Sequence, residues 1–208
     1  MKFKFNKSSG QASRLLLVLA VIVLVAVIIT FLVMRMAQQP SRPVQTSEPT
    51  PEQPTYERKL GDIRFVFQSS IDKGNVLSAS KVVNTQYAYA TLKDLTTTEK
   101  FIQVTVGAQN KGTVNIESGA WDLGDIIDSE GRKFIALDGY TISPWLPAVN
   151  LCKALLKPAF NPTPCTKIYE VSGESTNLKV EVRTGTDNSP DNFSSGKFDS
   201  ALINLIVK

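Results

Sequence analysis

Potential metal ligands are densest in an acidic run near the middle of the chain, formed by Asp122, Asp125, Asp128 and Glu130. Clustered carboxylates are the ligands that Ca²⁺ prefers in proteins. Their spacing departs from the D-x-[DN]-x-[DN]-G calcium loop, and the same residue types are common in turns, where they accept hydrogen bonds from the backbone. We therefore expect a solvated hairpin here, interpret the oxygen-rich segment 187–192 as a plain turn, and predict no metal site.

Catalytic chemistry has little support in the composition, because the chain contains no His. That absence removes the commonest general base and every nucleophile site that depends on a neighbouring imidazole. Ser78 and Lys81 have the spacing of a Ser-x-x-Lys dyad, but on a strand their side chains would face opposite sides. A hydrolase that uses two carboxylates is the remaining enzymatic alternative, although the sequence marks no pair. We predict no catalytic residues, no cofactor and no enzymatic activity.

The two cysteines, Cys152 and Cys165, can form one disulfide but cannot supply the four ligands of a structural zinc site. We expect them to be bonded to each other outside the cytoplasm, where thiols are oxidised. In the chain-entropy model a bridge of this span stabilises the fold by about 3 kcal/mol. The pair is therefore predicted to staple the segment 143–165, which has five prolines and does not fit a sheet.

The same segment contains three large apolar residues that are candidates for ligand contact, Trp145, Leu146 and Phe160. A proline-rich loop closed by a disulfide would be rigid, and loops held on a rigid scaffold are frequent binding surfaces. The alternative is that Trp145 covers the loop from inside. The other tryptophan, Trp121, lies between strand residues and is expected in the core.

The element that would decide the location of the domain is Leu15–Met34, a stretch of 20 residues without charge, proline or glycine. As a helix it would be about 30 Å long, the thickness of the hydrocarbon core of a bilayer. We predict a transmembrane signal anchor over 15–36. The basic tip 1–14 is expected in the cytoplasm and the C-terminal domain outside it. A cleaved signal peptide is the alternative, disfavoured by the length of the stretch and the bulky residues after it.

Two different regions follow the predicted anchor. Residues 37–59 are rich in Pro, Gln, Ser and Thr, and we predict a disordered linker that extends up to about 70 Å. Residues 60–208 are predicted as an all-β domain, an immunoglobulin-like antiparallel β-sandwich, because many short stretches alternate apolar and polar residues and no long stretch has a helical period. The clearest strands are expected at 63–67, 102–108 and 178–182. Further strands are expected at 75–83, 86–92, 114–117, 120–127, 133–137, 167–171 and 201–207.

Segment 101–134 contains a strand, an Asn-x-Gly turn and an Asp-x-x-Gly-Arg-x-Phe turn between aromatic-flanked strands. The residues in this order are Asn110, Gly112, Asp128, Gly131, Arg132 and Phe134. The order resembles a bacterial extracytoplasmic domain family of unknown function, sometimes labelled after a telomeric-repeat-binding factor. The resemblance implies an immunoglobulin-like fold, behind a single membrane anchor or in a lipoprotein. It implies no catalytic residues, because the family has none that are agreed.

The net charge of +4 comes from the flanks of the predicted anchor. Residues 1–59 carry 8 basic and 3 acidic side chains, whereas the remaining residues carry 15 and 16. A nearly neutral domain lacks the positive surface that phosphate backbones require, so we expect no nucleic-acid partner.

The function expected is that of a binding or structural module of the cell envelope. It would be a single-pass membrane protein that contacts the lipid bilayer through Leu15–Met34 and a protein or envelope polymer through its outer domain. The alternatives are the carboxylate-dependent hydrolase and an accessory subunit of an envelope assembly or secretion complex.

Overall fold

The computed structural model describes residues 23–25, 28–29, 54–84 and 92–208. The chain divides into two compact units, Met1–Glu52 and Gln53–Lys208, and the strands all belong to the second. The described residues leave out most of the predicted anchor and the predicted linker up to residue 53. The anchor residues that are described, 23–25 and 28–29, are helical. Within the described ranges, no helix combines the length and the apolar character needed to cross a membrane.

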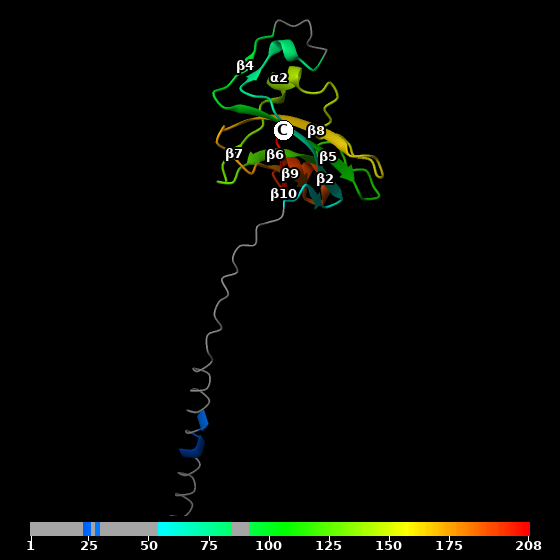
Figure 1. Cartoon of the computed structure of the whole chain (residues 1–208). Coiled ribbons are helices and arrows are strands. Elements are labelled where there is room, and N and C mark those ends of the chain that lie inside the picture. The colour runs from blue at the N-terminus through cyan, green and yellow to red at the C-terminus, as the bar shows by residue number, and fades with distance from the viewer. Residues whose placement is uncertain (1–22, 26–27, 30–53, 85–91) are drawn as a thin grey trace, which may run out of the picture. The chain divides into compact units, whose positions relative to one another are not determined.

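The second unit is built from antiparallel β-sheets (Figure 1). One four-stranded sheet has the order β1 (Glu57–Leu60), β2 (Ile63–Asp72), β5 (Lys100–Asn110) and β8 (Thr163–Val171). The other has the order β10 (Phe198–Asn204), β9 (Lys179–Gly185), β6 (Trp121–Ile127) and β7 (Lys133–Phe134). A separate hairpin pairs β3 (Val76–Leu77) with β4 (Leu95–Thr96). The prediction of an all-β fold of antiparallel strands is confirmed.

Helices in the second unit are short. They are α2 (Gly139–Ile142), α3 (Pro190–Ser194) and the 3₁₀ turns η1 (Ala79–Lys81), η3 (Ser143–Trp145) and η4 (Thr186–Asn188). The segment 187–192, interpreted from sequence as a turn, spans the end of η4 and the start of α3. Ser189 caps α3, accepting a hydrogen bond from the backbone N–H of Asn192.

The main core lies between the inward faces of the two four-stranded sheets. Alternating residues of β5, Ile102, Val104 and Val106, are wholly buried in it together with residues of β6, β8, β9 and β10. Period-2 alternation places every second side chain on one face of a strand, which is why the sequence pattern identified these positions. Trp121 of β6 is wholly buried in this core, as predicted.

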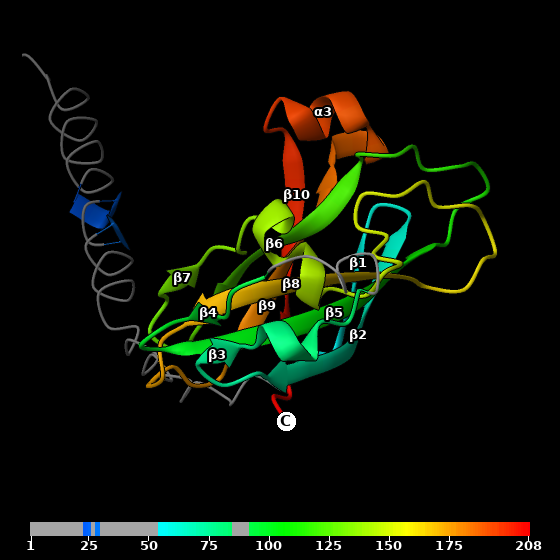
Figure 2. The ribbon, with the colours of Figure 1, turned by 90° about the horizontal axis from the view of Figure 1, so that it is seen from above.

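A second apolar cluster covers the opposite face of the β5–β8 pair. Phe101 of β5 and Ile168 of β8 contact Leu77, Ile142, Trp145 and Leu146 there. These four residues come from the β3–β4 hairpin and from the α2–η3 segment, which lie over β5 and β8 in both Figure 1 and Figure 2. Both faces of β5 and β8 are therefore buried near Phe101, which explains the near-continuous burial along these strands.

The segment that enters this unit joins the two four-stranded sheets. β1 pairs with β2 in one sheet. Thr55 exchanges hydrogen bonds with Asn204, at the end of β10 in the other sheet: its N–H donates to Oδ1 at 2.8 Å, and its carbonyl accepts from the Asn204 N–H at 2.9 Å. Arg58 Nε also donates to the Leu202 carbonyl at 3.1 Å. Residues 55–59, which were predicted as the end of the linker, are thus bonded into the second unit.

Several predicted strands are shorter than expected. The segment 75–83 contains β3 and η1, because Asp94 accepts a hydrogen bond from the Ala79 N–H at 2.7 Å and draws the chain into a turn. The segment 114–117 forms an isolated bridge through Ile116 and no strand. The predicted strand 86–92 lies outside the described residues, apart from its last position.

Candidate functional site

An open cleft of about 420 Å³ lies where the edge of β6 faces β8. Its walls come from β6, β8 and the two chain segments 135–146 and 150–153. β7 pairs with β6 only at Ile126 and Ile127, so the first residues of β6 have no strand partner on the cleft side. The chain then crosses to the other sheet, where Ala136 bridges to Tyr169 and the Leu137 N–H donates to the Ile168 carbonyl. This crossing leaves the cleft open between the sheets.

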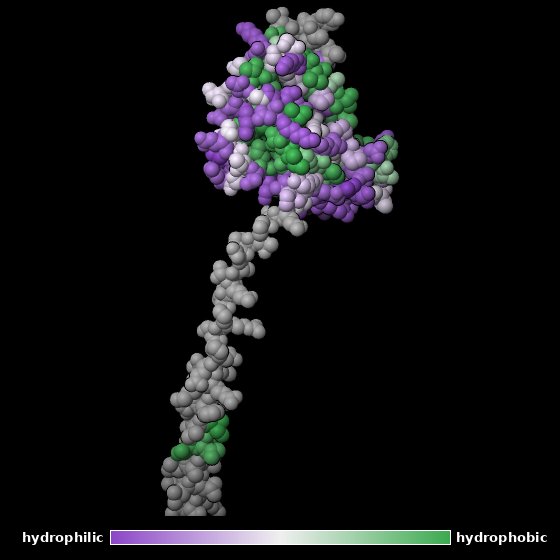
Figure 3. All heavy atoms as spheres, in the orientation of Figure 1, coloured by the Kyte–Doolittle hydropathy of each residue, from purple (hydrophilic) through white to green (hydrophobic). Residues whose placement is uncertain are grey.

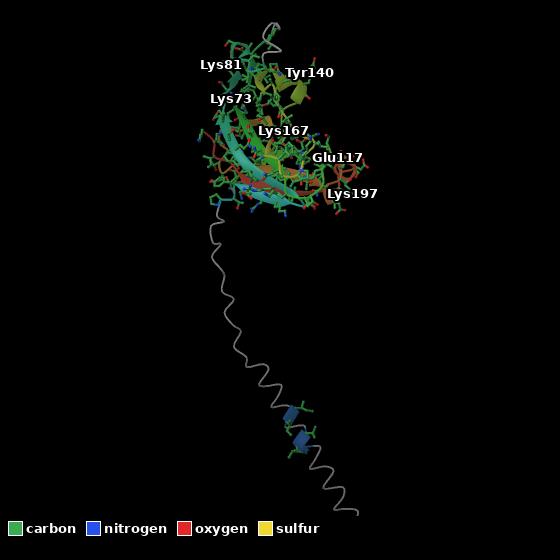
Figure 4. The ribbon with its side chains drawn as sticks, turned by 90° about the vertical axis from the view of Figure 1, so that its right-hand side faces the viewer. Lys73, Lys81, Glu117, Tyr140, Lys167 and Lys197 are labelled. Atoms are coloured by element: carbon green, nitrogen blue, oxygen red, sulfur yellow. A yellow bond between two sulfur atoms is a disulfide. The ribbon has the colours of Figure 1, made fainter. Side chains whose placement is uncertain are left out.

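Lys167 connects the two sheets at the bottom of the cleft. Its Nζ lies 2.9 Å from Asp122 Oδ2 and donates to the Leu123 carbonyl at 2.6 Å. Lys153 approaches the same carboxylate oxygen at 3.4 Å from the cleft mouth. The other oxygen of Asp122 accepts from the Leu123 N–H at 2.8 Å. Figure 4 places Lys167 near the middle of the unit, whereas Tyr140 lies toward the end that carries α2.

A β-bulge between Leu123 and Ile126 shapes the β6 wall. Bulges bend a strand and re-aim its groups, and they are frequent beside functional sites. The hydroxyl of Tyr169, which is wholly buried, donates to the Gly124 carbonyl at 2.9 Å within this bulge. Burial raises the pKa of Tyr169 well above its ordinary value, and the nearby carboxylate of Asp122 adds to that rise. The hydroxyl therefore remains a hydrogen-bond donor and takes no part in proton transfer at neutral pH.

Arg183 of β9 forms the charged wall beyond the bulge. It donates to Glu181 from Nε at 2.8 Å and also pairs with Asp125 at 3.3 Å. Burial would raise the pKa of Glu181, but the hydrogen bonds from Arg183 and Ser200, together with the positive charge of Arg183, outweigh it, so the pKa is lowered overall. A Cβ on Gly124 would approach Arg183 Nε to 2.5 Å, so a side chain here would require the ends of Arg183 and Glu181 to move. The carboxylates of Glu181 and Asp125 are therefore both ion-paired with Arg183.

The wall of the cleft that comes from segment 135–146 is apolar. Ala136, Leu137, Ile142 and Leu146 line it, and Ile135 stands at the rim with 75% of its surface exposed. Tyr140, 89% exposed, lies beside the lining residue Gly139. Figure 3 shows apolar side chains gathered on the face that carries the β6 label in Figure 1, bordered by hydrophilic ones. Apolar walls with a few fixed polar groups are typical of sites that bind ligands.

The disulfide predicted from sequence is present between Cys152 and Cys165, and Cys152 lines the cleft. Both sulfur atoms lie within 4.8 Å of a carboxylate oxygen of Asp122 and of each other. Within the residues described, this is the one group of His, Cys, Asp and Glu close enough to share a metal ion. The sulfur atoms are bonded to each other and the carboxylate is paired with two lysines, so the group does not fit a metal in this state.

Of the three predicted contact residues, only Phe160 is exposed. It is 60% exposed and lies under Lys157, whose Nζ is 5.5 Å from the ring centroid. Trp145 and Leu146 are buried in the second apolar cluster, 5% and 7% exposed. The Trp145 Nε1 donates to the Ser78 carbonyl at 2.8 Å. The expectation of an exposed loop surface is therefore wrong for Trp145 and Leu146, because the proline-rich segment that carries them folds onto β5 and β8. Leu146 lines the cleft, whereas Phe160 does not.

The acidic run is not a solvated hairpin throughout, because Asp122 and Asp128 are buried. Asp128 accepts hydrogen bonds from Arg132 Nε at 2.6 Å, from Ser175 Oγ at 2.9 Å and from the backbone N–H groups of Glu130 and Arg132. Burial would raise the pKa of Asp128, but these donors together lower it to about 2. The carboxylate thus organises the turn after β6 and offers no free ligand to a cation.

The residues of the resemblance motif have structural roles. Asn110 fixes the loop after β5, since Nδ2 donates to the carbonyls of Val114 and Leu156 and Oδ1 accepts from the Gly112 N–H. Gly131 has φ of +79° in the turn that Asp128 holds, a conformation that favours glycine. The motif therefore marks two turns at the ends of core strands, and neither turn lines the cleft.

Sequence reasoning missed Lys167, Asn150 and Arg183 as cleft residues. A signal for Lys167 was available, because the alternation Cys165, Lys167, Tyr169 puts this lysine on the inward face of β8. Asn150 carries no such signal. Its side chain donates to the Thr166 carbonyl and accepts from the Thr166 N–H, both at 2.9 Å, and so imitates a strand partner for β8.

Comparisons with known proteins give no family and no function. No family model and no curated protein matches the chain. A functionally unknown protein from Listeria monocytogenes has a TM-score of 0.42 at 9% identity, covering 74% of this chain and 82% of its own. A conserved hypothetical protein from Bacillus anthracis has a TM-score of 0.40 at 12% identity, covering 61% and 84%.

A third solved structure, ycdA from Bacillus subtilis, has a TM-score of 0.40 at 10% identity and covers 72% of this chain. The chain spans 38% of the length of that protein. These identities and TM-scores transfer neither a fold nor an activity.

Proposed function

We propose that this chain is a membrane-anchored, extracytoplasmic binding or structural module, with an immunoglobulin-like β-sandwich as its outer domain and no catalytic activity. The apolar stretch Leu15–Met34 supports the anchor, with the basic tip on the cytoplasmic side. Two antiparallel four-stranded sheets that share one core support the sandwich.

The observation that carries the binding role is the cleft between β6 and β8. It combines apolar walls with charged groups that are already held in place by each other, above all Asp122 and Lys167. Groups fixed before binding lose little conformational freedom when a ligand arrives. A cleft with an exposed apolar rim therefore suits recognition of a partner group more than turnover.

The partner proposed is a protein or an envelope polymer that inserts a partly apolar group between Ile135 and the lysines of the cleft. Ile135 and Tyr140 are exposed on one side of the mouth, and Lys153 is exposed on another. A group with both apolar and polar parts could use both sides at once. Phe160, which lies outside the cleft, is not part of this proposed contact.

Site-specific photo-crosslinking in living cells tests the proposal. A photoreactive phenylalanine replaces Ile135 at the rim in one variant and Ile206 in another. Ile206 is also exposed and does not line the cleft, so it serves as the matched control. We expect adducts from position 135 and none of the same mass from position 206. Equal labelling at both positions, or none at position 135, would contradict binding at the cleft.

A further inference from the structure

We propose that the Cys152–Cys165 disulfide is exchangeable, and that a thiol entering the cleft attacks Cys152 and releases Cys165. The partner class is a thiol, either a small molecule or an exposed cysteine of a protein. The reaction is stoichiometric: each chain either captures one thiol as a mixed disulfide or oxidises two thiols to a disulfide, without turnover. This inference goes beyond the proposed binding role and does not depend on it.

The two sulfur atoms differ in access. Cys152 is half-buried and lines the open cleft, whereas Cys165 is wholly buried on the inward face of β8. Thiol–disulfide exchange requires the incoming thiolate to reach one sulfur while the other leaves, so access decides which sulfur is attacked. The structure therefore gives a direction to the exchange, with Cys152 forming the mixed disulfide.

The charged groups beside the disulfide are not needed to hold it. A disulfide carries no charge, yet the buried carboxylate of Asp122 lies within 4.8 Å of both sulfur atoms. Lys167 and Lys153 lie 2.9 and 3.4 Å from this carboxylate. The side chains of Asp122 and Lys167 are only 11% and 22% exposed, so both charges lose hydration beside the disulfide. A carboxylate that can move a proton and cations that favour a thiolate are what exchange requires.

The first step balances as follows. The thiol transfers its proton to the Asp122 carboxylate, and its sulfur lone pair forms a bond to Cys152 Sγ. The electron pair of the Sγ–Sγ bond leaves with Cys165, which takes the proton back from Asp122. A second thiol then attacks the partner sulfur of the mixed disulfide; the bond to Cys152 Sγ breaks, its electron pair leaves with Cys152, and the proton of the second thiol goes to that sulfur. Overall, two thiols are oxidised to a disulfide and the two cysteines are reduced to thiols.

The loop that carries Cys152 remains attached when the bond opens, because other hydrogen bonds hold it. Reduction is therefore expected to lower the melting temperature without unfolding the unit, and the thiol of Cys152 would keep an acceptor, Asn150 Oδ1, at 3.4 Å from Sγ. The bonds that hold the loop are Asn150 to Thr166 through the amide, Leu151 N–H to Pro164 O, Trp121 Nε1 to Ala154 O, and Gly119 N–H to Lys153 O.

The first test measures reduction of the native state. The oxidised full chain is incubated with reduced glutathione at pH 7 without denaturant. Samples are quenched with acid and alkylated, and the free thiols are counted by mass spectrometry. Tryptophan fluorescence reports whether the protein stays folded. We expect reduction much faster than global unfolding, with native fluorescence retained. Reduction no faster than the unfolding rate measured in the same buffer would overturn the proposal.

The second test uses single-cysteine variants with oxidised glutathione. Cys165→Ser leaves Cys152, which should form a mixed disulfide at least about tenfold faster than Cys165 does in Cys152→Ser. Equal rates in the two folded variants would refute the assigned direction. Tryptophan fluorescence shows whether each variant is folded. If a variant is unfolded, the first test still applies, because it uses no variant.

The third test isolates the carboxylate. Asp122→Asn should slow reduction of the intact disulfide by about tenfold, the lower range of general acid–base effects. Asp125→Asn is the matched control, since Asp125 lines the same cleft from the same strand but pairs with Arg183. If the two substitutions had the same effect, or if exchange were faster in Asp122→Asn, the proposed role of Asp122 in proton transfer would be contradicted.

Discussion

Replacing Asn110 by alanine should destabilise the second unit strongly, although the residue lies far from the cleft lining. Its Nδ2 donates to Val114 O at 2.7 Å and to Leu156 O at 2.9 Å, and its Oδ1 accepts from the Gly112 N–H at 2.8 Å. Asn110 is almost wholly buried, so water does not replace these partners. Three hydrogen bonds at roughly 0.5–1.5 kcal/mol each give an expected loss of about 2–4 kcal/mol. For a unit of this size, that lowers the melting temperature by roughly 4–16 °C.

Urea unfolding of the full chain, followed by tryptophan fluorescence, measures this loss. Both tryptophans, Trp121 and Trp145, belong to the second unit and are buried, so the signal reports on that unit alone. Asn161→Ala is the matched control, because Asn161 is exposed, and its effect should stay within about 0.5 kcal/mol. A loss below about 1 kcal/mol for Asn110→Ala would refute the assignment of the three bonds as the anchor of this loop.

Three further predictions concern the β6 region and the turn after it. Asp128 has a folded-state pKa of about 2, below its ordinary 3.8. The contribution of this carboxylate to stability is therefore complete above its unfolded-state pKa and is lost as the pH falls through its folded-state pKa. When the free energy of unfolding is measured against pH, Asp128→Asn should change less between pH 4 and 2 than wild type. Parallel curves for the two proteins would contradict this prediction. Tyr169→Phe removes the donor to the bulge and should cost about 1–3 kcal/mol in urea unfolding, whereas an unchanged midpoint would mean that water replaces the hydroxyl. Gly124→Ala should displace the end of the Arg183 side chain and cost at most about 1 kcal/mol in urea unfolding, because flexible side-chain ends can move. An Arg183 that keeps its place in a crystal structure of the variant would contradict the close contact.

The strands of the core could be predicted from sequence because burial on one face imposes a period of two. β5 and β9 lie where alternation of apolar and polar residues predicted them, and Trp121 is in the core. The disulfide could also be predicted, since the chain has two cysteines and they allow one pairing.

The cleft could not be predicted, because its residues come together only through tertiary structure. Asp122 and Lys167 are far apart in sequence and meet because β6 and β8, which belong to different sheets, lie next to each other. The burial of Trp145 was equally hidden. Its neighbours Phe101 and Ile168 lie on the face of the sheet that a simple two-layer arrangement leaves to solvent. A layer added outside a sheet leaves no periodic signal in the segment that forms it.

The way the chain enters the second unit bears on how that unit would carry mechanical load. Tension applied through residue 54 reaches Thr55 first, which is bonded to Asn204 of one sheet, and then β1, which is paired along its length with β2 of the other. A pull on residue 54 therefore acts on groups that are bonded to both sheets, and the entry segment cannot detach without breaking bonds to each of them.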